Sequence, residues 1–103
     1  MIKIRLICSA GMSTSLVVQK MITAAEGKKI EVDIKAMSES AFDSLKEDVD
    51  LLLLGPQIGY LEPQIQERYK DKAWPIAVID MVDYGMLNGE KILNDGLKIM
   101  EEN

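Results

Sequence analysis

The stretch VDLLLL, residues 49–54, decides the fold, because Asp50 alone interrupts a run of apolar residues. Asp48 precedes the stretch and Gly55-Pro56 follows it, so its short length suits a strand. A strand that is apolar at nearly every position is typical of a sheet that is buried on both faces. We therefore expect an α/β protein in which helices cover both sides of a parallel sheet.

Strand and helix patterns alternate along the rest of the chain. Three further strands are predicted, over residues 2–7, 30–35 and 75–79. Strict alternation of apolar and charged residues over 30–35 indicates one wet face and a place at the edge of the sheet. The spacing of apolar residues predicts four helices, over residues 13–26, about 40–45, 61–69 and 88–101.

Short polar residues mark where some of these helices begin. Ser40 begins a segment that resembles a capping box, and Asn88 is the candidate N-cap of the last helix. Asp80 and Asp83 are expected to hold a turn or cap a helix through local hydrogen bonds. We assign neither aspartate a catalytic role.

The order of elements is β-α-β-α-β-α-β-α, which implies parallel strands joined by right-handed crossovers. The expected architecture is a small doubly wound three-layer sandwich with a four-stranded parallel sheet, formed by residues 1–103 as one domain. Ligands of such sheets bind beyond the carboxyl ends of the strands. Four loops are therefore candidate sites: residues 8–13, 36–38, 55–59 and 80–85.

Composition excludes several classes of chemistry. The chain has 103 residues, 12 basic and 17 acidic side chains, a net charge of −5, no His and one Cys. One Cys cannot form an internal disulfide and suits a reducing compartment. Zinc and haem lack their usual ligands, and no His-dependent nucleophile can form, so we expect no metal and no cofactor. The acidic balance argues against a nucleic-acid partner.

Hydropathy bears on location. No apolar run reaches the roughly 20 residues that span a bilayer. The first residues also lack the long apolar core of a signal peptide. We therefore expect a cytoplasmic protein that does not itself span the membrane.

The first loop has the pattern of an anion site. Cys8, the single thiol, stands at the carboxyl end of the first predicted strand, and a helix begins near Ser13. Backbone N–H groups at a helix N-terminus bind anions and favour a thiolate, and small residues let the backbone approach a ligand. Cys8 is the candidate catalytic residue. The candidate phosphate-binding residues are Ser9, Ala10, Gly11, Met12, Ser13, Thr14 and Ser15.

Spacing alone leaves a second interpretation of this loop open. A lone Cys after a strand can serve as a small buried hydrophobic residue. The hydroxyls of Ser13, Thr14 and Ser15 can simply cap the helix. The pattern therefore does not decide between a reactive and a structural Cys8.

Three segments together resemble a known family. Residues 8–15, CSAGMSTS, resemble the phosphorylation loop of enzyme IIB in the lactose/cellobiose branch of the bacterial phosphoenolpyruvate-dependent sugar phosphotransferase system (PTS). Residues 53–58, LLGPQI, resemble its third strand and the loop that follows, and residues 80–85 resemble its segment after the fourth strand. The similarity extends over essentially the whole chain.

The resemblance implies a phosphotransferase that carries a phosphoryl group as phosphocysteine. Cys8 would accept the group from a phosphohistidine of enzyme IIA, and residues Ser9 to Ser15 would cradle it. It would then pass to a sugar bound by the membrane permease, enzyme IIC. The sugar implied is a β-glucoside or a disaccharide of cellobiose, chitobiose or lactose type. The chain would be monomeric on its own and would associate peripherally with the permease.

Three other classes stay open. A low-molecular-weight tyrosine phosphatase has a Cys-x5-Arg loop, but position 14 is Thr14, so the arginine clamp on phosphate is missing. A flavodoxin-like module could bind a flavin phosphate, with Tyr60 and Tyr84 as candidate ring contacts. A docking module without chemistry would use the fold as a surface alone.

Apolar residues near the same sheet edge are candidates for partner docking. Two partners must approach Cys8 in turn, and an adaptable apolar rim suits brief contacts. The alternative for each residue is packing of its loop against helix ends. The candidates are Ile58, Tyr60, Met81 and Tyr84.

Overall fold

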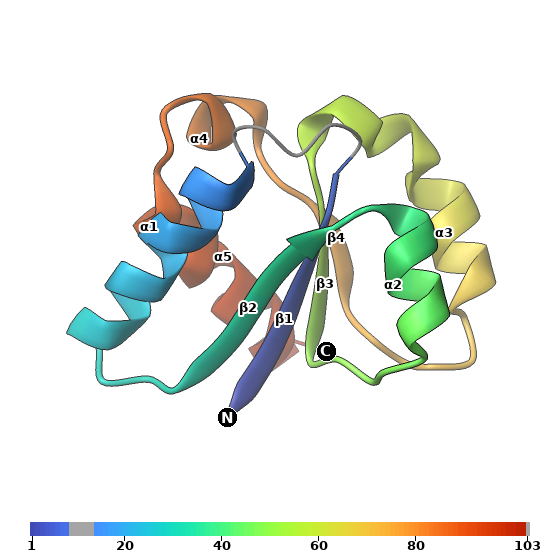
Figure 1. Cartoon of the computed structure of the whole chain (residues 1–103), viewed down its shortest axis with the longest axis horizontal. Coiled ribbons are helices and arrows are strands. Elements are labelled where there is room, and N and C mark those ends of the chain that lie inside the picture. Colours follow the sequence, from blue (N-terminus) through green and yellow to red (C-terminus); the bar gives the residue numbers. More distant parts are fainter. Residues whose placement is uncertain (9–13, 103) are drawn as a thin grey trace.

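The fold is a four-stranded parallel sheet between two layers of helices (Figure 1). A computed structural model describes residues 1–8 and 14–102. All pairings are parallel, and the strand order is β2-β1-β3-β4, which places β2 at an edge as its alternation predicted. The strands are β1 (Ile2–Ile7), β2 (Val32–Met37), β3 (Leu51–Leu54) and β4 (Ile76–Val78). The predicted α/β sandwich is confirmed.

The helices divide between the two faces of the sheet (Figure 1). One face is covered by α1 (Thr14–Gly27) and α5 (Gly89–Glu102). The other is covered by α2 (Glu39–Leu45) and α3 (Glu62–Arg68). No helix among the described residues is long and apolar enough to cross a membrane.

Strand β3 is buried on both sides, as its sequence predicted. Leu51 and Leu53 belong to the cluster under α1 and α5, whereas Leu52 and Leu54 belong to the cluster under α2 and α3. Burying each leucine side chain contributes about 1.5–3 kcal/mol. The run of four leucines therefore holds both helical layers to the sheet.

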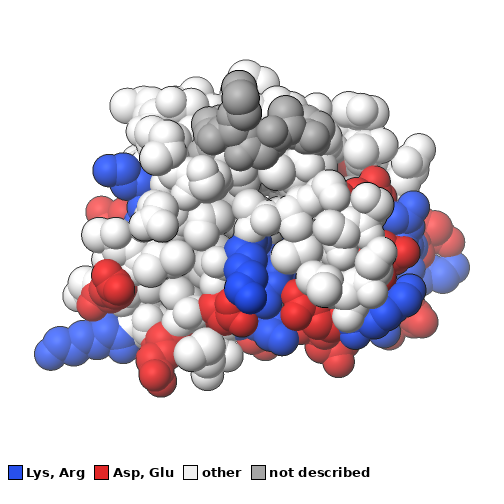
Figure 2. Space-filling view, in the orientation of Figure 1, with Lys and Arg blue, Asp and Glu red and all other residues white. Residues whose placement is uncertain are grey.

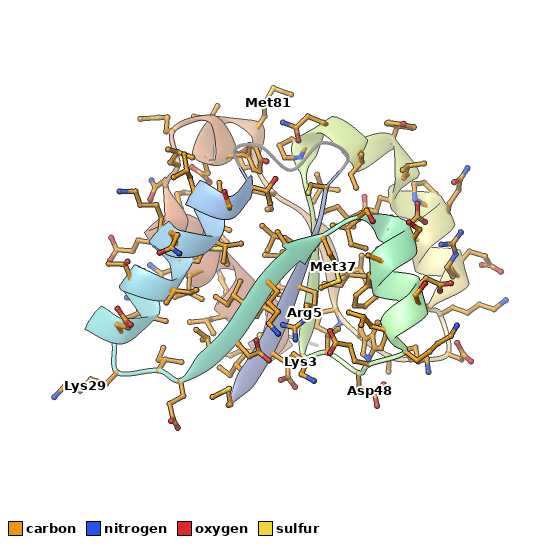
Figure 3. The ribbon with its side chains drawn as sticks, in the orientation of Figure 1. Lys3, Arg5, Lys29, Met37, Asp48 and Met81 are labelled. Atoms are coloured by element: carbon orange, nitrogen blue, oxygen red, sulfur yellow. The ribbon has the colours of Figure 1, made fainter. Side chains whose placement is uncertain are left out.

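Arg5 is an unexpected charge in the middle of central strand β1, with only 2% of its surface exposed. Its Nε donates to Glu47 Oε1 at 2.6 Å, and its guanidinium donates to Asp33 Oδ2 at 3.2 Å and to the Asp33 carbonyl at 2.8 Å. These hydrogen bonds from Arg5 lower the pKa of both Asp33 and Glu47. The group lies low in the sheet of Figure 3, beside Lys3, toward the amino ends of the strands.

Two predicted loops contain short helices instead. Pro56 begins a 3-10 helix, η1 (Pro56–Leu61), and Asp80 precedes α4 (Met81–Gly85). The Asp80 carboxylate accepts hydrogen bonds from the N–H groups of Val82 and Asp83 at 3.0 and 3.1 Å. The expected capping role of Asp80 is therefore confirmed, but the expected loop is a helix, because this cap satisfies the N–H groups of its first turn.

The other two expected caps have different outcomes. Asn88 caps α5, because its Oδ1 accepts from the Lys91 N–H at 3.1 Å, as predicted. The assignment of Ser40 as the first residue of a cap is wrong. Ser38 caps α2, since its Oγ accepts from the Ala41 N–H at 3.2 Å.

Candidate functional site

Cys8 directly follows β1 at the carboxyl edge of the sheet. Its backbone N–H donates to the Met37 carbonyl at 3.1 Å, and its Sγ lies 3.9 Å from the same oxygen. On the other side, the N–H of Gly55 donates to the carbonyl of Ile7 at 2.9 Å. The thiol, 8% exposed, therefore lies between the ends of β2 and β3, the region where ligands of such sheets bind.

Gly55 leaves room beside this thiol. A β-carbon at this position would lie 3.9 Å from Cys8 Cβ, 3.5 Å from the Ile7 carbonyl oxygen and 3.1 Å from Gln57 Oε1. The backbone of the turn after β3 thus passes close to Cys8. A β-carbon here would make ordinary contacts with Ile7 and Cys8, and only the flexible side chain of Gln57 would have to shift.

Of the predicted phosphate-binding residues, the structure describes two. Thr14 is the first residue of α1 and is 1% exposed, while Ser15 beside it is exposed. Thr14 Oγ1 lies 2.7 Å from the hydroxyl oxygen of Tyr84, in a hydrogen bond that either group can donate. Ser9, Ala10, Gly11, Met12 and Ser13 lie outside the described residues.

The four candidate docking residues separate into two pairs. Tyr60 and Met81 are 77% and 73% exposed, and Met81 points away from the body of the protein at the top of Figure 3. Ile58 is buried in the cluster under α2 and α3, and Tyr84 is 7% exposed within the cluster under α1 and α5. The structure therefore gives Ile58 and Tyr84 the packing role that was the alternative, because both side chains turn into the core.

Further exposed apolar side chains lie in α4, directly after it and in the first turn of α1. Val82 in α4 and Met86 directly after it are exposed, as is Leu16 in the first turn of α1. In the face that Figure 2 shows, charged side chains gather over the lower half and along both flanks, while the described part of the top is uncharged. These three exposed residues are not among the candidates that the sequence predicted. The Asp80 cap was the available signal, since it places Val82 and Met86 in or beside a helix and not in a loop.

Helix α4 is tied to α5 by charge. Lys91 Nζ in α5 lies 3.0 Å from Asp83 Oδ2 and 3.0 Å from Asp95 Oδ2. The hydrogen bond to Asp83, together with that to Asp95, raises the pKa of the Lys91 amine. The N–H of Asn88 also donates to the Asp83 carbonyl at 2.9 Å. Tyr84 therefore lies in a helix whose preceding residue, Asp83, is bound to α5.

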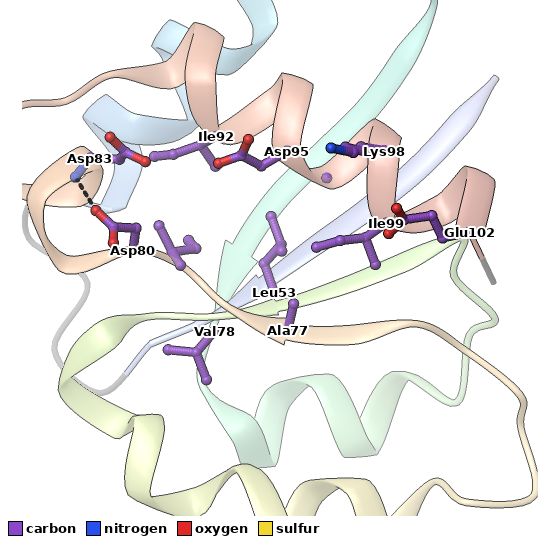
Figure 4. A pocket seen from close by; sticks show the side chains of 12 residues that line it. Leu53, Ala77, Val78, Asp80, Asp83, Ile92, Asp95, Lys98, Ile99 and Glu102 are labelled. Carbon is purple, nitrogen blue, oxygen red and sulfur yellow. Dashed lines mark hydrogen bonds between the residues drawn. The ribbon is translucent and has the colours of Figure 1, made fainter.

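A cavity of about 440 Å³ lies apart from Cys8, between β4 and α5 (Figure 4). Leu53, Ala77 and Ile92 form part of its apolar lining, and Asp95 and Glu102 carry charge at its rim. None of the described candidate site residues lines it. The cavity thus gives no ligand site for the chemistry of Cys8.

The chain is similar to a known protein family over most of its length. Residues 3–95 match the family described as "PTS system, Lactose/Cellobiose specific IIB subunit". The chain belongs to this family. This protein is therefore a sugar-specific IIB component of the PTS. IIB components act as phosphotransferases in sugar transport.

Individual relatives extend over nearly the whole IIB chain. It is 40% identical over 101 residues to the oligo-beta-mannoside-specific EIIB component of Bacillus subtilis, covering 95% of each chain. It is 39% identical over 95 residues to the cellobiose-specific EIIB component of Lactococcus lactis, covering 87% of this chain and 88% of that one. The solution structure of the cellobiose-specific IIB component from Borrelia burgdorferi superposes with a TM-score of 0.79 at 36% identity, covering 98% and 93% of the two chains.

Proposed function

We propose that Cys8 is the residue of this IIB component that carries the phosphoryl group. The observation that carries the proposal is the position of the single thiol, between the ends of β2 and β3 and directly before the segment that leads into α1. The backbone N–H groups and the dipole at the start of α1 favour an anion there. Residues Ser9 to Ser15 would surround the phosphoryl group, mainly through backbone N–H groups.

The phosphoryl group would come from a phosphohistidine of enzyme IIA. The Cys8 thiolate attacks phosphorus in line, so that an S–P bond forms while the N–P bond of the phosphohistidine breaks. The imidazole leaves with the electron pair of that bond. Since the leaving group lies on the partner, this step requires positioning and charge stabilisation by the IIB chain and no histidine of its own.

The second step would deliver the group to a sugar on the membrane permease, enzyme IIC. A sugar hydroxyl attacks phosphorus, an O–P bond forms, the S–P bond breaks, and the hydroxyl proton is released. Cys8 returns to the thiolate. The proposed sugar is a β-glucoside or a disaccharide of cellobiose, chitobiose or lactose type, which the relative named for cellobiose supports. The relative named for oligo-β-mannoside does not bear on this choice. The IIB chain would act as a monomer in the cytoplasm, docking peripherally on the permease.

Both partners would dock on the uncharged surface around the carboxyl edge of the sheet. Tyr60 of η1 and Met81 of α4 contribute the exposed apolar side chains that the sequence predicted. Val82, Met86 and Leu16 extend this docking surface. Flexible methionines adapt to two differently shaped partners, and a small surface of this kind suits brief contacts.

A phosphatase-like hydrolase is the alternative that the arginines oppose. A phosphatase loop has its arginine clamp at the position that Thr14 occupies here. The hydroxyl of Thr14 contacts Tyr84 instead. Arg5 is paired with Asp33 and Glu47, and Arg68 with Glu39 at 2.8 Å. These pairings support a carrier that stores the phosphoryl group over an enzyme that hydrolyses it.

The test is phosphorylation of the purified chain. The chain is incubated with phosphoenolpyruvate, the general PTS phosphotransferases and a IIA protein, and its intact mass and ³¹P spectrum are recorded. We expect one phosphoryl adduct with a thiophosphate signal, which Cys8→Ala abolishes. Ser44→Ala, a change at an exposed serine of α2, serves as the matched control and retains the adduct.

Two results would contradict the proposal. One is an adduct that persists in Cys8→Ala. The other is a wild-type chain that stays unmodified while IIA itself is phosphorylated. Turnover of a small aryl phosphate by the wild type at neutral pH would favour the hydrolase instead.

A further inference from the structure

The proposed phosphoryl-binding segment is held differently at its two ends. At one end, Cys8 continues from β1 and its N–H donates to the Met37 carbonyl. At the other end, Thr14 begins α1, and its buried hydroxyl lies 2.7 Å from the hydroxyl of Tyr84. The second contact joins residues that are 70 positions apart in the chain. A side chain from α4 therefore fixes the residue at which the segment meets its helix.

Tyr84 is itself firmly placed. Its ring belongs to the core cluster under α1 and α5, and its N–H donates to the Asp80 carbonyl at 2.9 Å. The neighbouring Asp83 is bound by Lys91 from α5. A continuous set of contacts thus runs from α5 through Asp83 and Tyr84 to Thr14.

We infer that Tyr84 is a positioning residue for phosphoryl transfer, acting through Thr14. Its hydroxyl fixes the first turn of α1, and thereby the N–H groups that would face the phosphoryl group. The inference rests on the proposed function of Cys8 and refines it. It also replaces the docking role considered for Tyr84, because a side chain that is 7% exposed and turned toward Thr14 offers little surface to a partner.

A positioning residue and a docking residue differ in their kinetics. Docking residues act on the affinity for phosphorylated IIA, which is reflected in KM. Tyr84 instead acts after the partner is bound, when the phosphorus and its N–H donors must be aligned with the thiolate. Loss of its hydroxyl therefore lowers the rate at saturating IIA and leaves KM unchanged.

The test compares two tyrosines that each lose only a hydroxyl. Tyr84→Phe removes the contact to Thr14, and Tyr69→Phe removes the hydrogen bond to Asp43 at 3.1 Å under the other face of the sheet. Phosphorylation of Cys8 is followed by rapid quench over a range of phosphorylated IIA concentrations. We expect Tyr84→Phe to lower the saturating rate about tenfold to a hundredfold, whereas Tyr69→Phe leaves it unchanged.

Changes at Thr14 approach the same hydrogen bond from its other side. Thr14→Val should reproduce the rate loss, the double variant with Tyr84→Phe should be no slower than either single variant, and Thr14→Ser should retain more of the rate than Thr14→Val. These changes also serve if Tyr84→Phe does not fold.

A Tyr84→Phe rate equal to that of Tyr69→Phe, or a change confined to KM, overturns the inference while Cys8 is still phosphorylated. A wild-type chain without any adduct overturns the proposed function, and the inference with it.

Discussion

The two faces of the sheet are built by different means. On one face, α1 and α5, each of 14 residues, cover an apolar cluster that includes Ile4, Leu6 and Leu53. On the other, α2 and α3 have seven residues each, and Phe42, Tyr69 and Trp74 pack ring to ring with centroids 5.2–5.8 Å apart. Arg5, with Glu47 and Asp33, occupies the amino-terminal half of this second face.

Because of this difference, the two faces are expected to be sensitive to different substitutions. Where two long helices meet over the sheet, the backbones approach so closely that a glycine is required, at Gly89. Where short helices leave part of a face without apolar cover, charged groups cover it instead. Their contribution to the stability of the fold depends on each buried charge having its partners. We therefore expect the first face to be most sensitive to added volume and the second to a lost charge.

The largest effect is expected from Gly89→Ala. A β-carbon at Gly89 would overlap the backbone of Lys20 and Met21 in α1, which cannot move aside as a flexible side chain could. We expect the free energy of unfolding to fall by about 3 kcal/mol or more. Gly85→Ala is the matched control, because a β-carbon there meets nothing within 4 Å, and it should stay within about 1 kcal/mol of the wild type. Equal denaturation midpoints for the two variants would contradict the close approach of α1 and α5.

A smaller effect is expected on the second face from Glu47→Gln. This change removes the carboxylate that binds Arg5 Nε at 2.6 Å and leaves a buried guanidinium with fewer partners. Urea denaturation should show a loss of about 1.5–3 kcal/mol. Glu67→Gln alters an exposed pair with Lys70 and should change stability by less than about 0.5 kcal/mol. If both glutamates cost the same, the Arg5 group adds no more than a surface ion pair.

The smallest effect on stability is expected from Met81→Lys, at the proposed docking surface near the carboxyl edge of the sheet. Met81 is largely exposed, so the unfolding free energy should change by less than about 0.5 kcal/mol. The KM for phosphorylated IIA should nevertheless rise, because a charge replaces an apolar contact. Leu45→Lys, at an exposed leucine in the last turn of α2, provides the control and should leave KM unchanged. A rise in KM for Leu45→Lys alone would contradict the proposed docking surface at Met81.

What sequence could predict here depended on the range over which each signal acts. The leucines of β3 and the alternation in β2 are local patterns that reflect burial directly, so the buried position of β3 and the edge position of β2 followed from them. The alternation of strand and helix patterns along the chain predicted the parallel pairing. The five-residue α4 is too short to show a helical period, and its cap at Asp80 was the single local sign of it. The contacts of Arg5 with Glu47 and of Thr14 with Tyr84 span 42 and 70 residues. No local pattern specifies such pairs, because they exist only once the layers have assembled.

The edge strands of this sheet have a consequence for solubility. An open edge presents unpaired backbone groups that can recruit a strand from another molecule. Here β4 has only three residues, and β2 carries Asp33 and Lys35 along its length. Short edges and charged edges both disfavour strand addition. The two edges of this sheet therefore disfavour the joining of two copies of the chain edge to edge.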